Sequence, residues 1–314
     1  MARRKPAKVH GFIAIDKASG PSSRAVVNKV GWLLGERRCG HTGTLDPAAT
    51  GLLIIAFGEA TKAVRWLTSR VKTYQTDVVF GASTTTDDAA GEIVETCPVP
   101  DLVRELVGQT AASPVGLIDQ VPPSVSALKK AGVRDYERVR RGETVEREAR
   151  RVQLDAVRTL DVGANTARFE LTVGSGFYVR SWARDLGAKL GTLAHVGTLR
   201  RTKGSGFDVE DAVTVDALEG MRESARLSRL VPVGDVLQRV LPVLTVDAET
   251  SVALGYGKKP LAPEHVLAWP FFVVVDETGA LICVARIRND KPGGPRLQVE
   301  RGFGKGARTP AQIA

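Results

Sequence analysis

Cysteine and histidine are both scarce in this chain. Its 314 residues include four scattered histidines and three widely separated cysteines, Cys39, Cys97 and Cys283. An odd number of distant cysteines does not suggest a disulfide framework, and no cysteine and histidine spacing resembles a zinc site. We therefore expect reduced thiols in a cytosolic (cytoplasmic) protein, and no structural metal.

Long apolar runs are missing as well. No stretch approaches the ~18 apolar residues that a membrane-spanning helix needs, and the apolar stretch near the N-terminus is too short for a secretory signal. Three common motifs are also absent: the phosphate-binding loop G-x-x-x-x-G-K-[ST], the dinucleotide fingerprint and the nucleophile elbow G-x-S-x-G. The sequence thus gives no sign of a membrane protein, and its glycine-rich segment is not a P-loop.

Basic residues, in contrast, are in surplus. Lysine and arginine number 44 against 35 acidic residues, which gives a formal net charge of +9 and a pI near 9.6. This charge favours an anionic partner such as nucleic acid, although a basic surface kept for solubility remains the alternative. Residues 127–151 contain nine Lys or Arg and five Asp or Glu, a mixture that fits either a solvated helical face or a phosphate-contacting insertion. The sequence LRRTKG at 199–204 adds a second cationic segment.

The segment GHTGTLDPAATG, residues 40–51, concentrates turn-forming residues around a single carboxylate, Asp46. An apolar run that is typical of a buried strand follows at once. One interpretation is structural: Asp46 makes an Asx-type turn bond and Pro47 fixes the bend. The other is that the turn presents Asp46 and His41 in an active site.

Two further segments carry candidate polar groups. Tyr74 lies in KTYQ on a predicted strand, and Tyr178 and Arg180 lie in GFYVRSWARDLG, where a strand turns into a helix. Alternation puts Tyr178 and Arg180 on the same side of an extended segment. The structural alternatives are core packing with satisfied hydroxyls for the tyrosines and an ion pair for the arginine.

Hydrophobic periodicity predicts a mixed α/β chain. The predicted strands cover 11–16, 52–57, 72–81, 151–160, 166–175 and 195–207, and the predicted helices cover 24–34, 59–69, 101–110, 133–142 and 178–191. After residue 241 several short strands alternate with Gly, Pro and Asp, which predicts a separate small β domain.

These segments, taken in order, resemble a known family. GHTGTLDPAATGLL, GEATK, KTY, QVPPSVSALK, GFYVRSWARDLG and LRRTKG are similar in order and spacing to the bacterial TruB-type tRNA pseudouridine synthases. The resemblance runs from about residue 11 to residue 207. It implies an enzyme that flips uridine-55 out of the T-loop of tRNA and isomerises it to pseudouridine. It implies no metal, nucleotide or redox cofactor.

The resemblance also implies a fold. We expect mixed α/β (α+β) architecture with a large, mostly antiparallel central sheet flanked by helices, plus a small C-terminal PUA-like β domain. The corresponding division is a basic tail at 1–10, a catalytic domain at 11–238 with a T-arm-binding insertion around 97–150, and an RNA-binding domain at 239–314. The expected partner is the T-arm stem-loop of tRNA, bound by a monomer without an obligate protein partner.

The resemblance assigns chemistry to Asp46 as the nucleophile, which would attack C1′ or remove a C2′ proton. Arg180 would pair with Asp46, keeping it ionised and aimed. Tyr74 would stack on the target base. The remaining implied roles are contact with the flipped nucleotide for His41, the uracil site for Tyr178 and Leu199, phosphate binding or loop structure for Lys17 and Lys62, and the outer part of the site for Asp88.

Three positions depart from the family pattern: Ala18, where proline is usual, Thr85, where aspartate is common, and Val125, where tyrosine is common. We expect these changes to affect local geometry more than activity. Two alternative functions stay open, an RNA-binding or RNA-folding module and a guide-RNA-dependent relative that acts within a ribonucleoprotein. The combination of Asp46, Tyr74, Tyr178 and Arg180 favours the enzyme, because a pure RNA binder needs no carboxylate beside phosphates.

Overall fold

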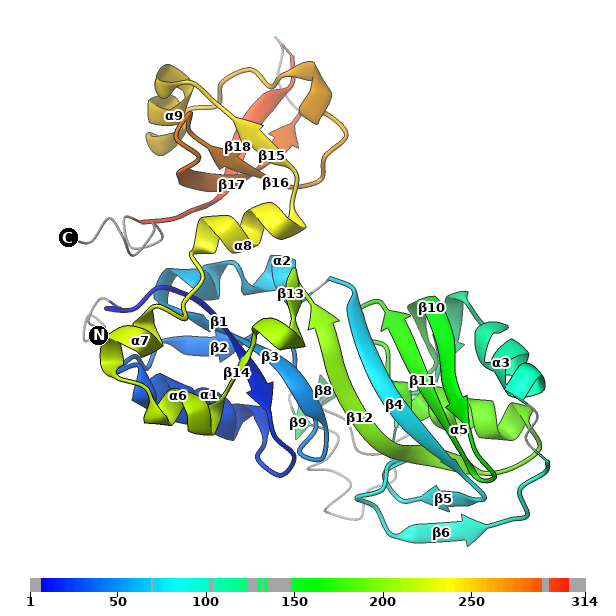
Figure 1. Cartoon of the computed structure of the whole chain (residues 1–314). Helices are drawn as coiled ribbons and strands as arrows, with labels where there is room; N and C mark the ends of the chain where they lie inside the picture. Colours follow the sequence, from blue (N-terminus) through cyan, green and yellow to red (C-terminus); the bar gives the residue numbers. More distant parts are fainter. Residues whose placement is uncertain are drawn as a thin grey trace.

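The computed structural model describes residues 7–68, 70–101, 104–123, 129–130, 133–134, 148–289 and 294–304. Two sheets organise these residues. In Figure 1 the large sheet runs across the lower part of the molecule, the small sheet lies above it, and helix α8 lies between them. The expected mixed α/β architecture with a separate C-terminal β unit is therefore confirmed.

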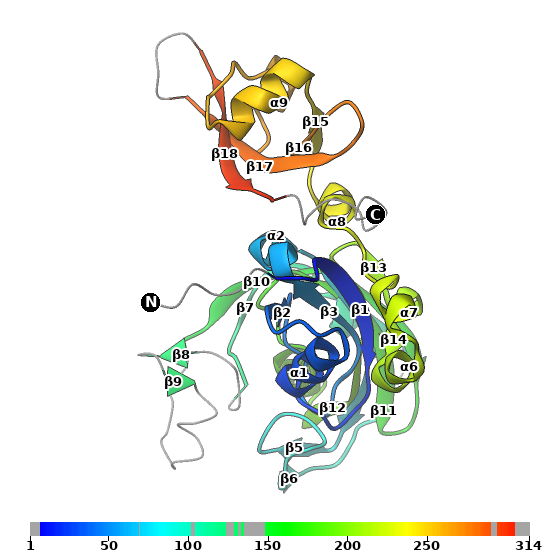
Figure 2. The same cartoon turned by 90° about the vertical axis from the view of Figure 1, so that its left-hand side faces the viewer.

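Within the described ranges the large sheet has ten strands in the order β14-β1-β3-β12-β4-β11-β10-β7, with β2 paired to β3 and β13 paired to β12. Neighbours are antiparallel except for β1 with β14 and β3 with β12, which are parallel. The strands are β1 (Gly11–Lys17), β2 (Cys39–His41), β3 (Thr50–Phe57), β4 (Lys72–Phe80), β7 (Gly116–Gln120), β10 (Arg150–Val162), β11 (Thr166–Val173), β12 (Ala194–Gly204), β13 (Phe207–Asp208) and β14 (Val213–Thr214). Two hairpins stand apart from this sheet, β5 (Ala82–Thr84) with β6 (Ile93–Thr96) and β8 (Lys129–Lys130) with β9 (Val133–Arg134), as Figure 2 shows.

The helices are short and lie on the outside of the sheets. They are α1 (Ser23–Leu33), α2 (Val64–Thr68), α3 (Arg104–Ala112), α5 (Val179–Lys189), α6 (Val215–Gly220), α7 (Glu223–Leu227), α8 (Val233–Val240) and α9 (Ala248–Gly255), with 3₁₀ turns η1 (Gly58–Lys62), η2 (Val209–Asp211) and η3 (Glu264–Val266). Helix α1 begins as predicted, because the Ser22 side chain accepts a hydrogen bond from the backbone N–H of Ala25.

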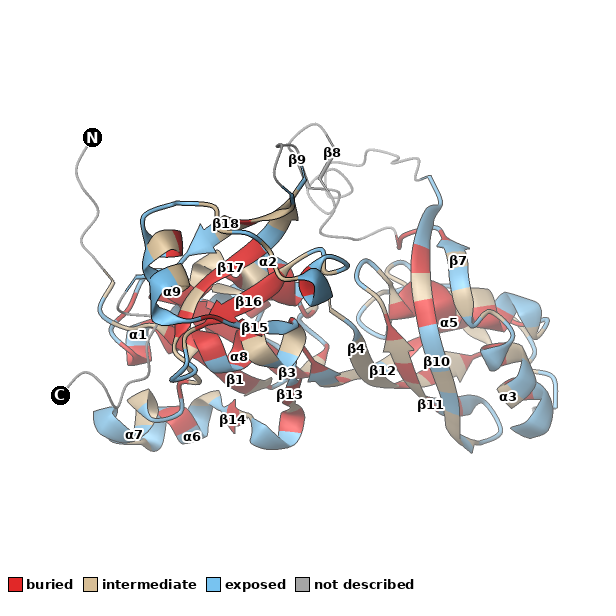
Figure 3. Ribbon diagram, turned by 90° about the horizontal axis from the view of Figure 1, so that it is seen from above, coloured by how far each residue is buried: buried red, intermediate tan, exposed pale blue. Residues whose placement is uncertain are grey.

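Both faces of the large sheet are covered in the half that contains β1 and β3. On β1, Ile13 and Ile15 join one apolar core with α1 and α6, whereas Phe12 and Ala14 point to the other face and join a core with α2 and α8. This arrangement explains why the run LLIIAF in β3 is apolar at every position. Figure 3 shows these strands buried and the outer faces of α6 and α7 exposed.

The small sheet contains β15 (Val243–Thr245), β16 (Phe272–Val275), β17 (Leu281–Arg288) and β18 (Arg296–Gly302). Its strand β16 alternates between two cores: Phe272 and Val274 pack within the unit, while Val273 and Val275 join the core that contains Phe12 and helix α8. The expected boundary at 238/239 falls inside α8, and the two units share a continuous apolar core.

Two predicted helices differ from the structure. In place of the single helix predicted at 59–69, residues 59–68 form η1 and α2, because the chain tightens into i→i−3 hydrogen bonds at Ala63 and Trp66; residue 69 lies outside the described part of the chain. The helix predicted at 133–142 is wrong at its start, where Val133 and Arg134 form strand β9; residues 135–142 lie outside the described part of the chain.

The burial of Cys283 predicts its reactivity toward an alkylating reagent. Cys283 lies in the core of the small unit, and burial raises the pKa of its thiol to about 12. Because the thiolate is the nucleophile, we expect iodoacetamide at pH 8 to leave Cys283 unmodified in the folded protein and to modify it in urea, as mass spectrometry of tryptic peptides would show. The half-buried Cys97 is the internal comparison. Equal labelling of Cys283 in both conditions would contradict the buried position.

Candidate active site

The loop that carries Asp46 is held from both sides by hydrogen bonds. The hydroxyl of Ser23 at the start of α1 both donates to the Leu45 carbonyl and accepts from the Leu45 N–H, each at 2.8 Å. The turn closes with a backbone bond from Ala49 N–H to the Asp46 carbonyl at 3.1 Å. The carboxylate of Asp46 is not part of this turn bond, and its side chain points to α5.

Lys17 supports the same loop from below. Its side chain is completely buried, and its ammonium group donates hydrogen bonds to three carbonyls, those of Ala18, Pro47 and Ala49, at 2.9, 3.0 and 2.7 Å. Burial lowers the pKa of Lys17, and the nearby Asp46 carboxylate opposes this shift. Of the two roles predicted for Lys17, the geometry favours loop structure. The departure at Ala18 does not remove the contact, because that residue contributes its backbone carbonyl.

Arg180 connects Asp46 to Asp88. One guanidinium nitrogen lies 2.8 Å from Asp46 Oδ2, and the other lies 3.5 Å from Asp88 Oδ2 and donates to the Thr86 carbonyl at 2.9 Å. The Arg180 side chain is 6% exposed, whereas that of Asp46 is 43% exposed. The predicted ion pair is therefore present, and it leaves the carboxylate accessible from solvent.

The position of Arg180 depends on how α5 begins. The amide side chain of Gln120, which is buried on β7, donates to the Tyr178 carbonyl at 2.9 Å and accepts from the Tyr178 N–H at 2.8 Å. One helical turn after Arg180, Arg184 pairs with Asp87 and with Asp185. The sequence analysis did not assign a role to Gln120. The motif QVPPS contained Gln120, but nothing in its spacing indicated a contact with residue 178.

Strand β12 brings the separate segments together. It pairs with β3 on one side, where Gly51 lies opposite Arg201, and with β4 on the other, where Tyr74 lies opposite Arg201. Gly51 has φ +94°, and a Cβ there would lie 2.2 Å from the Arg201 carbonyl oxygen, so only glycine allows this approach. The end of the Asp46 loop and the strand of Tyr74 thus become neighbours.

The resulting cavity has a volume of about 400 Å³, which is within the usual range for small-molecule sites. Five of the predicted residues line it: Asp46, Tyr74, Tyr178, Arg180 and Leu199. Asp46 is the carboxylate among the described lining residues. The cavity also contains Lys72 and Arg201, which sequence analysis missed, although each lies two residues from a predicted site residue on a strand.

His41 and Lys62 are outside this lining set. His41 ends β2, and burial, followed by the positive charges of Arg201 and Arg24, lowers its pKa; its Nδ1 is buried without a hydrogen-bonding partner among the described residues. Lys62 lies in η1 beyond the opposite end of β3 and binds Glu59 at 2.6 Å. The structure therefore does not bring Lys62 to the Asp46 cavity.

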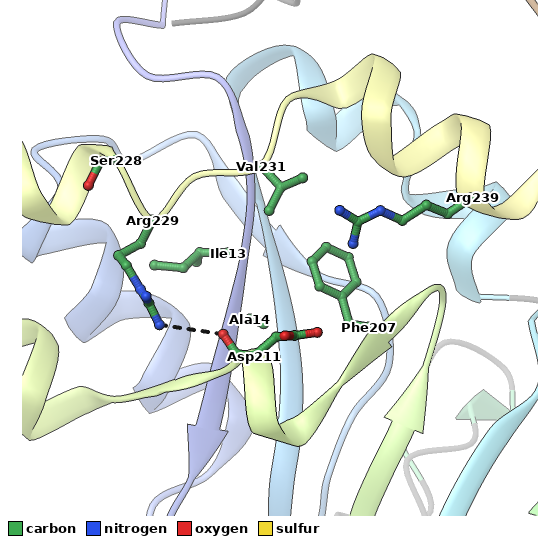
Figure 4. A pocket seen from close by; sticks show the side chains of 8 residues that line it. All are labelled: Ile13, Ala14, Phe207, Asp211, Ser228, Arg229, Val231 and Arg239. Atoms are coloured by element: carbon green, nitrogen blue, oxygen red, sulfur yellow. Dashed lines mark hydrogen bonds between the residues drawn. The ribbon is translucent and has the colours of Figure 1, made fainter.

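A second cavity of about 290 Å³ lies at the outer edge of β1, beside Ile13 and Ala14 (Figure 4). Its two arginines hold the connection to the small unit: Arg229 donates to the Asp211 carbonyl at 3.5 Å, and the guanidinium of Arg239 lies 5.2 Å from the Phe207 ring centroid. None of the predicted site residues lines this cavity, so the Asp46 cavity is the candidate active site.

Metal-binding clusters and membrane-spanning helices are both absent from the described ranges. No cluster of three or more His, Cys, Asp or Glu side chains there is arranged to hold a metal ion. No helix in the same part of the chain has the length and apolar character needed to cross a membrane.

Comparison with known proteins identifies a family. Residues 32–179 match the model of the TruB family pseudouridylate synthase N-terminal domain, and residues 180–242 match that of the tRNA pseudouridylate synthase B C-terminal domain. The chain is 40% identical over 270 residues to tRNA pseudouridine synthase B of Roseobacter denitrificans, covering 85% of this chain and 86% of that protein. It is 38% identical over 311 residues to the protein of the same name from Paracoccus denitrificans, covering 98% and 100%.

Solved structures show the same fold at lower identity. The Cbf5–Nop10–Gar1 complex contains a chain with a TM-score of 0.72 and 22% identity, covering 94% of this chain and 85% of that one. At this identity the likeness concerns the fold alone. The curated relatives and the family models carry the assignment: the chain belongs to the TruB family and is a tRNA pseudouridine synthase.

Proposed function

We propose that this enzyme isomerises uridine-55 in the T-loop of tRNA to pseudouridine, with Asp46 as the nucleophile. The observation that carries the proposal is the accessible Asp46 carboxylate, held 2.8 Å from Arg180 in a cavity lined by two tyrosines. A hydrolase would require a second carboxylate to activate water. Here a single carboxylate lines the described cavity, which suits a reaction that must keep the detached base from water.

The proposed reaction replaces one bond between ribose and uracil with another. The bond from N1 of uracil to C1′ breaks, the base turns within the cavity, and a bond from C5 to C1′ forms. The hydrogen on C5 leaves as a proton and N1 gains one, so the product is an isomer of the substrate. In one route Asp46 attacks C1′ as the N1 bond breaks, and its ester bond is displaced when C5 bonds to C1′. In the other route Asp46 removes the C2′ proton as the N1 bond breaks and returns it when C5 bonds to C1′. Both routes need an ionised and accessible carboxylate.

The predicted residues that line the cavity have distinct roles in this proposal. Tyr74 stacks on the flipped base, Tyr178 and Leu199 bound the uracil site, and Arg180 aims Asp46. Two predicted residues act from outside the lining set: His41 contacts the flipped nucleotide, and Lys17 fixes the loop through its backbone carbonyls. The division into a tail at 1–10, a catalytic unit at 11–238 and an RNA-binding unit at 239–314 is likewise our proposal.

Tritium release tests the proposed position. We expect a T-arm stem-loop labelled at C5 of its uridines to release one equivalent of tritium per RNA, because pseudouridine formation replaces the C5 hydrogen. A matched stem-loop with cytidine in place of uridine-55 should bind equally well and release none. Release from the second RNA would mean that another uridine is modified. Tight binding without release from either would favour the RNA-folding function.

A further inference from the structure

The Asp46 cavity has a second charged region, formed by Lys72 on β4 and Arg201 on β12. Lys72 precedes Tyr74 by two residues on the same strand, so both side chains project from the same side of β4. The Lys72 ammonium donates to the carbonyls of Thr68 and Arg70 at 2.9 and 2.8 Å. These two bonds hold the ammonium at the cavity wall, one pleat along the strand from Tyr74.

Arg201 is fixed by the loop and by strand β3. Its Nε donates to the Leu52 carbonyl at 2.6 Å, its Nη2 donates to the Gly43 carbonyl at 3.1 Å, and the residue is 4% exposed. Gly43 lies between the two cations, because a Cβ there would be 3.5 Å from both Arg201 Nη1 and Lys72 Cε. Arg201 thus serves as a buried structural cation, and Lys72, which is less buried, is the cation that can reach a substrate.

The charges in this cavity do not balance. The described lining residues include three cations, Lys72, Arg180 and Arg201, and one carboxylate, Asp46. Arg180 is paired with Asp46 and, outside the lining set, with Asp88, which leaves Lys72 and Arg201 as neighbouring positive charges. Burial, and secondarily the charge of Arg201, lowers the pKa of Lys72 to about 8. The other titratable groups that line the cavity are the hydroxyls of Tyr74 and Tyr178.

An anion beside Lys72 would relieve this repulsion, and the substrate carries one charge per nucleotide. Uracil is uncharged and offers only partial charges, whereas a phosphate oxygen is a full acceptor for an ammonium group. We propose that Lys72 binds the backbone phosphate next to the target nucleotide and so holds the ribose in place while the base, stacked on Tyr74, detaches and turns. The identity of the nucleotide rests on the proposed function; the phosphate contact itself does not.

The charge of Lys72 can be tested by substitution and pH. We expect Lys72→Met to weaken T-arm binding at pH 7 by about 10- to 100-fold, the range of a charge-assisted hydrogen bond, and Lys72→Arg to retain most of the affinity. Lys189→Met, which removes an exposed lysine at the far end of α5, is the matched control and should bind as the wild type does.

The pH dependence follows from the same contact. Phosphate binds the protonated lysine and raises its pKa, so wild-type affinity is full below pH 8 and falls as the pH rises above 8, by at most about tenfold per unit. Lys72→Arg stays charged throughout this range and should lose the dependence. A wild-type affinity that does not change between pH 7 and 9.5, or an unchanged slope in Lys72→Arg, would overturn the proposal.

A modified RNA separates a phosphate contact from a structural role. Two stem-loops carry a neutral methylphosphonate, one on the 5′ side and one on the 3′ side of the target nucleotide. The wild type and Lys72→Met should bind one of these two RNAs with equal affinity, because the phosphate that Lys72 contacts is no longer charged. If Lys72→Met bound both modified RNAs more weakly than the wild type by the same factor as the unmodified RNA, the lysine would act structurally and the proposal would be overturned. These are binding measurements, so they decide the matter whether or not the RNA releases tritium.

Discussion

Asp46→Asn is expected to bind the T-arm within about threefold of the wild type and to lower tritium release by about four orders of magnitude or more, the scale seen when a nucleophile is removed. The amide has the shape of the carboxylate but cannot attack C1′ or accept the C2′ proton. The loop should persist, because Ser23 and Lys17 hold it through backbone groups. Filter binding and tritium release on the same preparation measure the two effects.

Asp185→Asn is the matched control for this change. It removes a carboxylate that pairs with Arg184 and does not line the cavity, so turnover should stay near the wild-type value. If Asp46→Asn lost binding and turnover together, Asp46 would be a structural turn residue, which is the alternative that the sequence left open. If it kept turnover, the nucleophile would lie elsewhere.

Arg180→Met is expected to affect both stability and turnover. Removing one member of a fully buried ion pair costs about 3–5 kcal/mol. Because the Asp46 side chain is 43% exposed, water compensates part of the loss, and we expect a decrease of roughly 2–3 kcal/mol in the free energy of unfolding, measured with urea. Turnover should fall by about 100- to 1,000-fold, because Asp46 loses the cation that aims it.

Arg184→Met on the same helix distinguishes a lost cation from a damaged helix. Arg184 is more exposed and pairs with Asp87 and Asp185 away from the cavity. We expect it to lower stability by less than Arg180→Met and to leave turnover within a few-fold of the wild type. Equal effects of the two substitutions on turnover would contradict a specific role for Arg180.

The sequence predicted those parts of the site that follow from local pattern. Turn chemistry around Asp46 indicated how its side chain is presented, and the ion pair predicted for Arg180 and Asp46 is present. Alternation along an extended segment does not describe Tyr178 and Arg180, because helix α5 begins at Val179. Lys17 and Lys62 show the limit of this reasoning. Lys17 follows a predicted strand and Lys62 falls within a predicted helix, and only the packed structure shows that one is buried beneath the loop and the other lies beyond the far end of β3.

The pairing of strands that lie far apart in the sequence was the part of the fold that the sequence predicted least well. Six strands of the large sheet were predicted, whereas the short strands β2, β7, β13 and β14 were not. Nothing local indicates that β12 lies between β3 and β4. That order depends on the close approach of β3 to β12 at Gly51 and on which apolar faces of the strands and helices pack against each other. Lys72 and Arg201 were missed for the same reason, because their proximity comes from sheet order and not from spacing along one segment. Val125, the third departure from the family pattern, lies outside the described residues.

The apolar core shared by α8, Phe12 and strand β16 affects how this protein can be recombined with its relatives. The C-terminal unit does not behave as an interchangeable module, because Val273 and Val275 complete a core whose other half belongs to the catalytic sheet. A chimera that exchanges the last 75 or so residues must therefore exchange their counterparts on β1 and α8 as well. Substitutions on the two sides of this contact must remain complementary, because together they fix the relative orientation of the two units.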